Sequence, residues 1–363
     1  MFIAVFALLI FSCWYAPGRL GRWLKLKKSV NPLRAASLLL IALYMLVIMR
    51  GYSSSVSPLL GLLYNLLGLF MIFHVYLFFL TILADLARLC LKRKTVGKIP
   101  TAILIAVSLS LVAFAFVKAR GLTITETQIK IKGLEKPVTL VHAPDLHLGA
   151  QRGGDWLEET IEAINGLNPD LVVYNGDLAD SDVALTEEIF GLFRKVSAPQ
   201  FMTTGNHEYY VDTSLVLSLA EKAGLNILRN EVAEVFGFQL VGLEYMNADR
   251  QTFDAHMVND LTIEEELPKL KLDRDRPIVL FHHSPVGLEY VRKAGADAML
   301  SGHTHGGQVF PGTILIQTRF KYWKGLYQEG DTALLVSRGA GTFGPWARLG
   351  SFNEIQLVRL VPL

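Results

Sequence analysis

Apolar segments dominate the first third of this chain, and they restrict it to folds that place helices in a membrane. Short loops rich in basic residues separate the segments, which cover residues 1–16, 33–50, 58–84 and 99–117. The last three are long enough to cross a hydrocarbon core of about 30 Å at about 1.5 Å per residue. The first is short for a span and could form a tilted or re-entrant element. We therefore expect a transmembrane anchor with about four helices over residues 1–118.

The charge of the chain is divided as sharply as its hydropathy. Residues 1–120 hold 14 Lys or Arg and a single acid, Asp85, whereas the remainder holds 21 basic and 32 acidic residues. Such asymmetry is typical of chains that bind a membrane or a nucleic acid. Because the basic residues flank apolar runs, we expect a lipid bilayer as the partner, with no nucleic acid and no obligate protein partner. Asp85 lies three residues before Arg88, and we predict an ion pair between them.

The basic residues also predict an orientation. Five lie between the first and second apolar segments, with Arg34 at the start of the second, and five lie between the third and fourth, whereas the second loop is nearly uncharged. Basic residues in short loops remain on the cytoplasmic side, so both basic loops are expected there. Lys118 and Arg120 after the fourth segment are a weaker signal in the opposite sense. We expect a multi-pass protein of the cell membrane whose C-terminal domain is extracytoplasmic.

The rest of the chain alternates between strand and helix patterns. A linker over residues 119–137 contains an alternating stretch that predicts a strand, and a domain follows over residues 138–363. Within that domain we predict strands at 138–143, 171–175 and 199–203, helices at 155–167, 185–196 and 214–223, and mainly β-structure afterwards. This alternation is typical of α/β folds with packed layers.

Five short polar motifs in the domain follow apolar runs of strand type. Side chains just past the carboxyl ends of buried strands sit on a rigid scaffold and face a crevice. Asp145, for example, follows the run 138–141, and His283 follows the run 277–281. The motifs are Asp145-Leu146-His147, Gly176-Asp177, Gly205-Asn206-His207-Glu208, His282-His283-Ser284-Pro285 and Gly302-His303-Thr304-His305.

The motifs supply carboxylate, carboxamide and imidazole groups without sulfur, which suits a hard or borderline divalent cation. Asp145 and His147 are two residues apart and can reach one metal together. His303 and His305 have the same spacing and can serve one metal or two. A single Asp or His at a strand end is more often a cap than a ligand. Six of the nine histidines fall inside these motifs, however, five of them as ligand or catalytic candidates, and this concentration favours a metal site.

The ordered series of motifs resembles the calcineurin-like metallophosphoesterase superfamily. The long last motif, Gly302-His303-Thr304-His305-Gly306-Gly307-Gln308, resembles a bacterial branch that is exported or membrane-tethered. The resemblance implies a four-layer α-β-β-α sandwich with the metals at strand ends between two sheets. It implies one metal bound by Asp145, His147, Asp177 and His305, and a second bound by Asp177, Asn206, His283 and His303. His282 is the alternative to His283, and His207 would face the substrate phosphate as a catalytic residue.

The resemblance also implies an activity, the hydrolysis of phosphoester bonds by a hydroxide that bridges two divalent metal ions. Mn²⁺ is our first choice of metal, with Fe or Zn as alternatives. Tethering to the membrane favours a phosphorylated lipid or envelope phosphoester as the substrate, with a small phosphoester also open. Candidate substrate contacts are Arg338, Arg348 and Lys324. The alternatives are a UDP-diacylglucosamine-type pyrophosphatase acting at the cytoplasmic face and a catalytically silent membrane scaffold.

Overall fold

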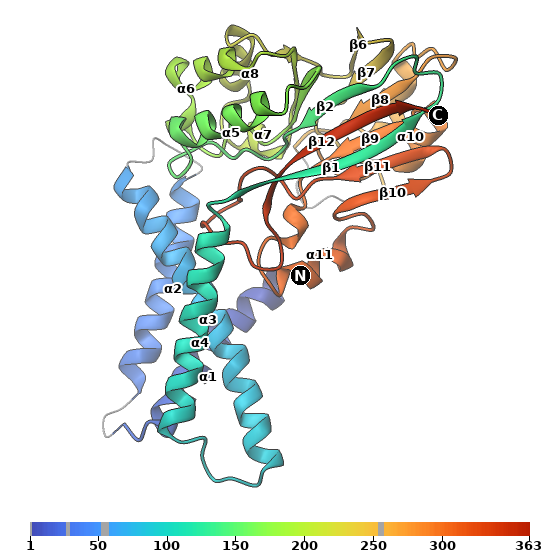
Figure 1. Ribbon diagram of the computed structural model, residues 1–363. Coiled ribbons are helices and arrows are strands. Elements are labelled where there is room, and N and C mark those ends of the chain that lie inside the picture. The colour runs from blue at the N-terminus through green and yellow to red at the C-terminus, as the bar shows by residue number, and fades with distance from the viewer. Residues whose placement is uncertain (1, 27–29, 52–57, 253–257) are drawn as a thin grey trace.

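The computed structural model describes the chain except for residues 1, 27–29, 52–57 and 253–257. In the part described, the N-terminal region forms a bundle of long helices (Figure 1). Their bounds are Phe2–Trp23 (α1), Asn31–Gly51 (α2), Pro58–Cys90 (α3) and Lys98–Lys118 (α4). Helix α3 packs against the other three and forms the centre of this N-terminal helix bundle.

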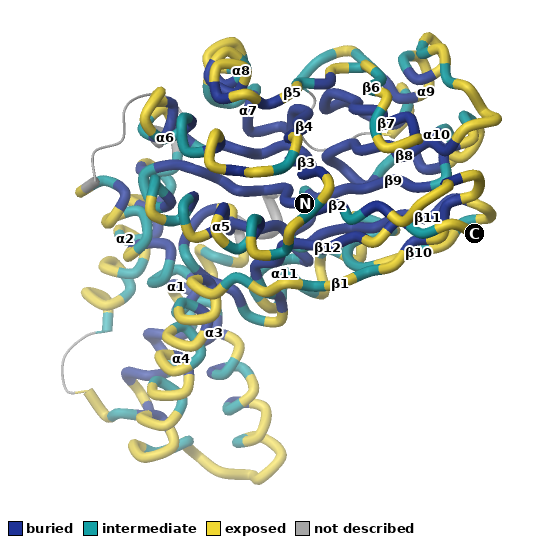
Figure 2. Tube along the Cα trace, turned by 45° about the horizontal axis from the view of Figure 1, so that its top comes forward, coloured by how far each residue is buried: buried dark blue, intermediate teal, exposed yellow. Residues whose placement is uncertain are grey.

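Three helices among the described residues are long and apolar enough to cross a membrane, over Asn31–Ile48, Leu59–Cys90 and Lys98–Lys118. Helix α1 is not among them and carries Pro17 in its interior. Large apolar side chains such as Leu39 and Leu62 are exposed on the bundle, and the lower parts of the helices are mostly exposed (Figure 2). Such a surface is expected to contact lipid. The crossing of all four segments stays a prediction.

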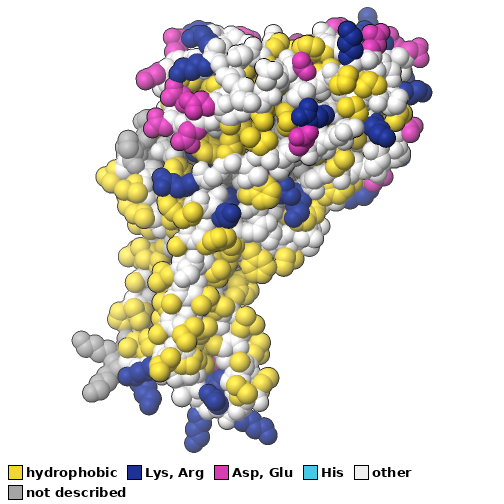
Figure 3. Space-filling view, in the orientation of Figure 1, with side chains coloured by type: hydrophobic (Ala, Val, Ile, Leu, Met, Phe, Trp, Pro, Cys, Tyr) yellow, Lys and Arg dark blue, Asp and Glu magenta, His cyan; other side chains and the backbone are white. Residues whose placement is uncertain are grey.

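The basic turns of the bundle lie at the end remote from the C-terminal domain. Lys and Arg side chains gather at that end, below a band of apolar side chains (Figure 3). The predicted ion pair is confirmed, since Asp85 Oδ1 lies 3.0 Å from Nε of Arg88. Arg19 also pairs with Asp85, and the Tyr15 hydroxyl donates to it at 2.6 Å. These contacts compensate the charge of a buried carboxylate.

Within the described residues, the C-terminal domain contains two six-stranded sheets. The first has the order Leu122–Ile131 (β1), Asn353–Pro362 (β12), Val138–His142 (β2), Leu171–Asn175 (β3), Gln200–Thr203 (β4) and Asn226–Ile227 (β5). The second has the order Gly325–Glu329 (β10), Thr332–Val336 (β11), Ala298–Ser301 (β9), Ile278–Phe281 (β8), Phe238–Gly242 (β7) and Glu231–Val235 (β6). Residues from facing strands, including Val173 and Phe281, form an apolar core between the sheets.

Helices cover the outer faces of the two sheets, so the predicted four-layer sandwich is confirmed. The first sheet is covered by Gly154–Gly166 (α5), Glu187–Gly191 (α6) and Thr213–Lys222 (α8), and the second by Ile263–Glu266 (α9) and Leu288–Ala294 (α10). The short helix Asn206–Tyr210 (α7) follows β4. Helix Gly312–Arg319 (α11) lies beside the N-terminal helix bundle (Figure 1). The helix predicted at 185–196 is shorter, because it continues as a 3₁₀ turn over Leu192–Lys195.

The segment 119–137 joins the bundle to the domain and contains the predicted strand. This strand, β1, pairs in parallel with β12 along its whole length. Around the joint, the Asn353 carboxamide donates to the carbonyl of Ala119 at 2.7 Å, and the backbone N–H of Arg348 donates to the carbonyl of Ala115 at 2.9 Å. The end of α4 is therefore held by the domain.

Candidate metal centre

The five predicted motifs converge because their strands are neighbours. Strands β2, β3 and β4 lie side by side in the first sheet, and β8 and β9 are adjacent in the second. The loops after β2 and β3 carry Asp145 and Asp177, and Asn206 begins α7 after β4. The loops after β8 and β9 carry His283 and His303. Side chains from both sheets therefore meet at one end of the sandwich.

The backbone of these loops is unusual. Five of the candidate ligands, all in described parts of the chain, have positive φ angles: Asp145 (58°), His147 (52°), Asp177 (56°), His303 (70°) and His305 (50°). Such angles are uncommon for residues with a side chain and cluster at functional sites. Gly302 and Gly205 pack directly against the carboxylates of Asp145 and Asp177, where a Cβ atom would collide. This contact explains why both motifs contain glycine.

The first group of candidate ligands is Asp145, His147 and His305, whose ligand atoms all lie within 4.8 Å of one another. Nε2 of His147 is 2.9 Å from Nε2 of His305. Oδ1 of Asp145 lies 3.4 Å from His305 Nε2 and 3.9 Å from His147 Nε2. All three side chains are buried. The lone pairs of two imidazoles and a carboxylate thus face a common point.

The second group is Asp177, His283 and His303, whose ligand atoms also all lie within 4.8 Å of one another. Oδ2 of Asp177 lies 3.1 Å from Nε2 of His283 and 3.9 Å from Nε2 of His147, so one carboxylate oxygen reaches both groups. This is the position that a bridging carboxylate requires. Oδ1 of Asn206 is buried and makes no hydrogen bond to any described residue. An unsatisfied buried carboxamide oxygen here fits a cation ligand.

The structure separates the two neighbouring histidines of the fourth motif. The His283 Nδ1–H donates to the carbonyl of Asn175 at 2.6 Å, which leaves Nε2 facing Asp177. In His282, Nδ1 lies 2.8 Å from the carbonyl of Ser284, and Nε2 accepts from the N–H of Met246 at 3.3 Å. Both nitrogens of His282 are engaged by backbone, so His283 is the residue placed to bind a metal.

The electrostatics of the cluster favour positive charge. Burial alone would raise the pKa of Asp177, but His283 and His207 outweigh it and hold this pKa well below its usual value. Burial would lower the pKa of His283, but Asp177 and Asp145 raise it to about 10. The pKa of His305 lies well below its usual value because of burial and the neighbouring His147, which keeps this imidazole neutral. The carboxylates thus draw positive charge to this point, as protons or as cations.

Asp180 is a site residue that the sequence analysis missed. Its Oδ1 lies 2.5 Å from Nδ1 of His147 and 2.7 Å from Nδ1 of His207. A parallel bridge between Leu148 and Ala179 brings the two loops together. A carboxylate behind a histidine fixes its tautomer and directs the other ring nitrogen at a metal. The available sequence signal was an Asp three residues after Asp177.

His207 lies at the edge of the cluster, in the first turn of α7. Its ring is 4.7 Å from that of His147 and 5.3 Å from that of Phe343, both edge to face. Burial alone would lower the pKa of His207, but Asp177 and Asp180 raise it to about 9. This imidazole therefore holds a proton at neutral pH, beside the two groups of candidate ligands.

Glu208, the next residue, holds the loop that carries Asp177. Its carboxylate accepts from the N–H groups of Asp177 at 2.9 Å, Leu178 at 2.7 Å and Gly205 at 2.7 Å. Charge-assisted bonds of this kind are short and strong. Glu208 is part of the predicted third motif, but spacing gave it no role.

The structure does not place Arg348 for substrate contact. Its side chain is fully buried, and its guanidinium donates to the carbonyls of His305 at 2.7 Å and Arg338 at 2.8 Å and to the Asn353 carboxamide at 2.9 Å. Arg348 thus stabilises the loop of His305 through hydrogen bonds to backbone carbonyls. Of the other two candidates, Arg338 forms a 2.7 Å ion pair with Glu354 and is partly exposed. Lys324 Nζ lies 4.1 Å from the centre of the Trp323 ring.

Comparison with known proteins gives a consistent result. The family model described as calcineurin-like phosphoesterase matches residues 138–307. A Helicobacter pylori protein named an uncharacterised metallophosphoesterase is 31% identical over 244 residues, and the match covers 66% of this chain and 64% of that protein. A metallophosphoesterase of Aquifex aeolicus is 30% identical over 68% of this chain and 92% of its own length. A Danio rerio protein named transmembrane protein with metallophosphoesterase domain is 29% identical over 80% of this chain and 71% of its own length.

Proposed function

This chain belongs to the calcineurin-like phosphoesterase family, and we propose that it is a membrane-anchored, metal-dependent phosphoesterase with two metal ions. One observation carries the proposal. A single oxygen of Asp177 lies within reach of His283 on one side and His147 on the other, so the two groups of buried ligands share one carboxylate. This arrangement would allow two divalent cations to share one carboxylate, as in two-metal hydrolytic sites.

The donor set fits two metals. The first would be held by Asp145, His147, Asp177 and His305, and the second by Asp177, Asn206, His283 and His303. When bound, two divalent ions would polarise the phosphoryl oxygens and supply the nucleophile by lowering the pKa of a solvent molecule. Carboxylate, carboxamide and imidazole ligands favour Mn²⁺, with Fe or Zn as alternatives.

The residues of the chain supply the remaining parts of the reaction. We propose that His207, which lies beside both groups of candidate ligands, donates a proton to the leaving oxygen, a contribution typically worth about 10²–10⁴-fold in rate. Asp180 orients His207 and His147 together. Glu208 and Arg348 fix the loops of Asp177 and His305 and so preserve the geometry of the cluster.

We propose that the substrate is a phosphorylated lipid or another phosphoester of the cell envelope, as expected for the membrane-tethered bacterial branch. The apolar helices of the bundle and the transmembrane name of the Danio rerio relative support a membrane location. The basic turns lie at the end of the bundle remote from the C-terminal domain that carries the metal cluster (Figure 3). With those turns in the cytoplasm, the cluster would be extracytoplasmic.

The test uses the purified full-length chain and methyl p-nitrophenyl phosphate, a simple phosphodiester. Chelation should abolish hydrolysis, and added Mn²⁺ should restore it. Asp177→Asn should lower both the metal content and the rate, whereas His207→Ala should retain the metal and lose about 10²-fold or more in kcat. Asp155→Asn, an exposed carboxylate on α5, is the matched control.

Three results would contradict the proposal. A rate that survives chelation would exclude a metal-dependent mechanism. Metal loss in His207→Ala would contradict the role given to that histidine. A protein that binds two metals and hydrolyses no phosphoester would be the silent scaffold instead.

A further inference from the structure

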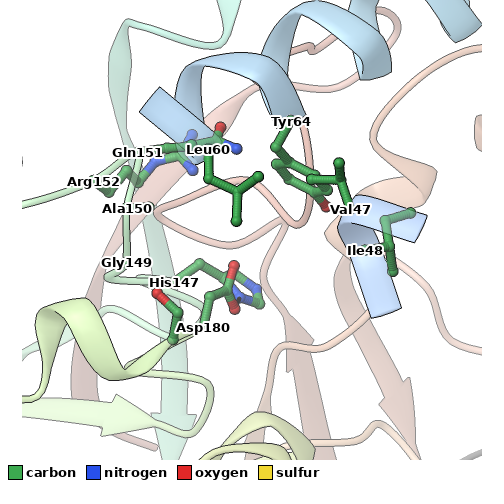
Figure 4. A pocket seen from close by; sticks show the side chains of 13 residues that line it. Val47, Ile48, Leu60, Tyr64, His147, Gly149, Ala150, Gln151, Arg152 and Asp180 are labelled. Carbon is green, nitrogen blue, oxygen red and sulfur yellow. Dashed lines mark hydrogen bonds and ion pairs between the residues drawn. The ribbon is translucent and has the colours of Figure 1, made fainter. Parts of the chain in front are cut away.

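A pocket between the catalytic domain and the N-terminal helix bundle reaches the edge of the metal cluster at His147 and Asp180 (Figure 4). One wall is formed by the ends of α2 and α3 that face the domain, through Val47, Ile48, Leu60 and Tyr64. Leu60 points into the pocket, toward the polar groups opposite. The pocket contains about 610 Å³ of empty space, including the part that opens to solvent. One wall of the pocket beside the cluster is therefore apolar and made by helices that could span a membrane.

The rest of the pocket wall is polar and belongs to the catalytic domain. It includes His147 and Asp180, the metal-ligand candidate and the carboxylate behind it, and Arg152. Arg152 is only 3% exposed, and its guanidinium donates to the carbonyl of Thr342 at 2.9 Å. The same guanidinium lies over the ring of Trp346, 5.7 Å from its centre. A cation held in a fixed orientation therefore lies on the same pocket as the cluster.

The two walls are held together by specific contacts. The backbone N–H of Trp346 donates to the Asn65 carboxamide on α3 at 2.8 Å. Gly61 on the same helix packs against Ala150 so closely that a Cβ atom at Gly61 would come within 3.2 Å of its carbonyl oxygen. These contacts fix the end of α3 against the domain. The apolar wall is thus a built part of the pocket and not a flexible tether.

We infer that the site takes an amphiphilic phosphoester, whose phosphate lies at the metal cluster and whose hydrocarbon segment lies against Ile48, Leu60 and Tyr64. This inference rests on the proposed phosphoesterase function and narrows its substrate class. A ligand with charge at one end and a hydrocarbon chain at the other matches a pocket that is polar on one wall and apolar on the other. A small hydrophilic phosphoester would leave the apolar wall uncovered.

The test is a homologous series of alkyl p-nitrophenyl phosphodiesters, from methyl to hexyl, hydrolysed by the full-length chain in lipid nanodiscs. The reacting group is constant, so only contacts of the alkyl chain change. Partial burial of each methylene should raise kcat/KM about twofold, which gives about 30-fold from methyl to hexyl. Nanodiscs without the protein correct for uptake of the longer esters by lipid.

Two variants replace a residue of the apolar wall by tryptophan, whose larger side chain fills part of the pocket. In Leu60→Trp the hexyl-to-methyl ratio of kcat/KM should fall below about fivefold, and Ile48→Trp provides the same test if the first variant misfolds. Leu83→Trp is the matched control, because Leu83 is 60% exposed on the same helix and lines neither wall. It should keep the ratio of the wild type. Metal content verifies that each variant retains the cluster.

Binding of methylphosphonate and hexylphosphonate to the metal-loaded protein, measured by calorimetry, separates this inference from the proposed function. If hexylphosphonate binds more tightly than methylphosphonate but no ester is hydrolysed, the apolar wall binds the hydrocarbon segment and the proposed phosphoesterase function is wrong. Hydrolysis with a kcat/KM that does not change with alkyl chain length would support the phosphoesterase function and overturn the amphiphilic substrate. The amphiphilic substrate would also be overturned if both Trp variants kept the wild-type hexyl-to-methyl ratio of kcat/KM. It would be overturned, too, if neither phosphonate bound and no ester was hydrolysed.

Discussion

Oδ1 of Asp180 lies 2.7 Å from Nδ1 of His207, and the same oxygen lies 2.5 Å from Nδ1 of His147. One carboxylate therefore orients both a metal-ligand candidate and the proposed proton donor. The burial of Asp180 alone would raise its pKa, but the two imidazoles outweigh this and lower it, so it remains ionised throughout the neutral range.

Asp180→Asn should lower kcat by about 10–100-fold, as loss of a carboxylate that orients a metal-binding histidine commonly does. An amide can still accept one hydrogen bond, but it cannot stabilise positive charge on His207. The measurement is steady-state kinetics with metal analysis of the same preparation. Asp182→Asn, an exposed neighbour, should behave as the wild type. An unchanged kcat in Asp180→Asn would contradict the inference that Asp180 orients the two histidines for the reaction.

Arg348→Met should destabilise the protein by about 3 kcal/mol or more, because several buried carbonyl groups lose their donor. The loop of His305 loses its support, so the metal content should fall as well. Thermal unfolding of the full-length chain measures the first effect. Arg359→Met is the control, since the ion pair of Arg359 with Glu126 is exposed and should contribute less than about 1 kcal/mol. Equal stability of both variants would show that Arg348 is not a structural residue.

His142 should make the stability of the domain depend on acidity. Burial, and secondly the charge of His283, lowers the pKa of His142 to about 4. Its Nδ1 lies 2.9 Å from the carboxamide oxygen of Gln356, and its Nε2 faces the Asn175 carboxamide nitrogen at 3.3 Å, an arrangement suited to the neutral ring.

The unfolded chain binds a proton near pH 6.5 and the folded chain only near pH 4. The stabilisation is therefore complete above pH 6.5 and is lost as the pH falls to about 4, a change of about 3 kcal/mol. Thermal unfolding between pH 7 and pH 4 should show a smaller decline in His142→Gln than in the wild type. Parallel declines in the two proteins would contradict this origin.

The orientation in the membrane is tested with two cysteine variants in a background where Cys13 and Cys90 are replaced by Ser. Asp275→Cys, exposed on the domain, should react with a membrane-impermeant thiol reagent in intact cells or spheroplasts. Lys94→Cys, in a basic turn, should react only after lysis. The reverse pattern would place the cluster in the cytoplasm and make a nucleotide-linked lipid such as UDP-diacylglucosamine the first substrate to test.

Local patterns predict the alternating α/β elements and the loops that carry the polar motifs, whereas the four-layer sandwich and the assignment of ligands to two metals came from the family resemblance. Buried strands ending in polar residues identify the loops, and parallel neighbours bring those loops together, as with Asp145 and Asp177. The burial of Arg348 could not be predicted, because it depends on carbonyls brought together by folding from three separate segments. The choice between His282 and His283 likewise required the backbone groups around each ring.

The pairing of β1 with β12 has a consequence for how the protein is made. In the first sheet, β12 lies between β1 and β2, although it follows them by more than 200 residues. During synthesis, the edges of β1 and β2 that pair with β12 therefore stay without their partner strand until residues 353–362 have emerged from the ribosome. Such long-range pairings form slowly and leave strands exposed to aggregation in the meantime. The insertion of one late strand thus both closes the sheet and fastens the domain onto its helices.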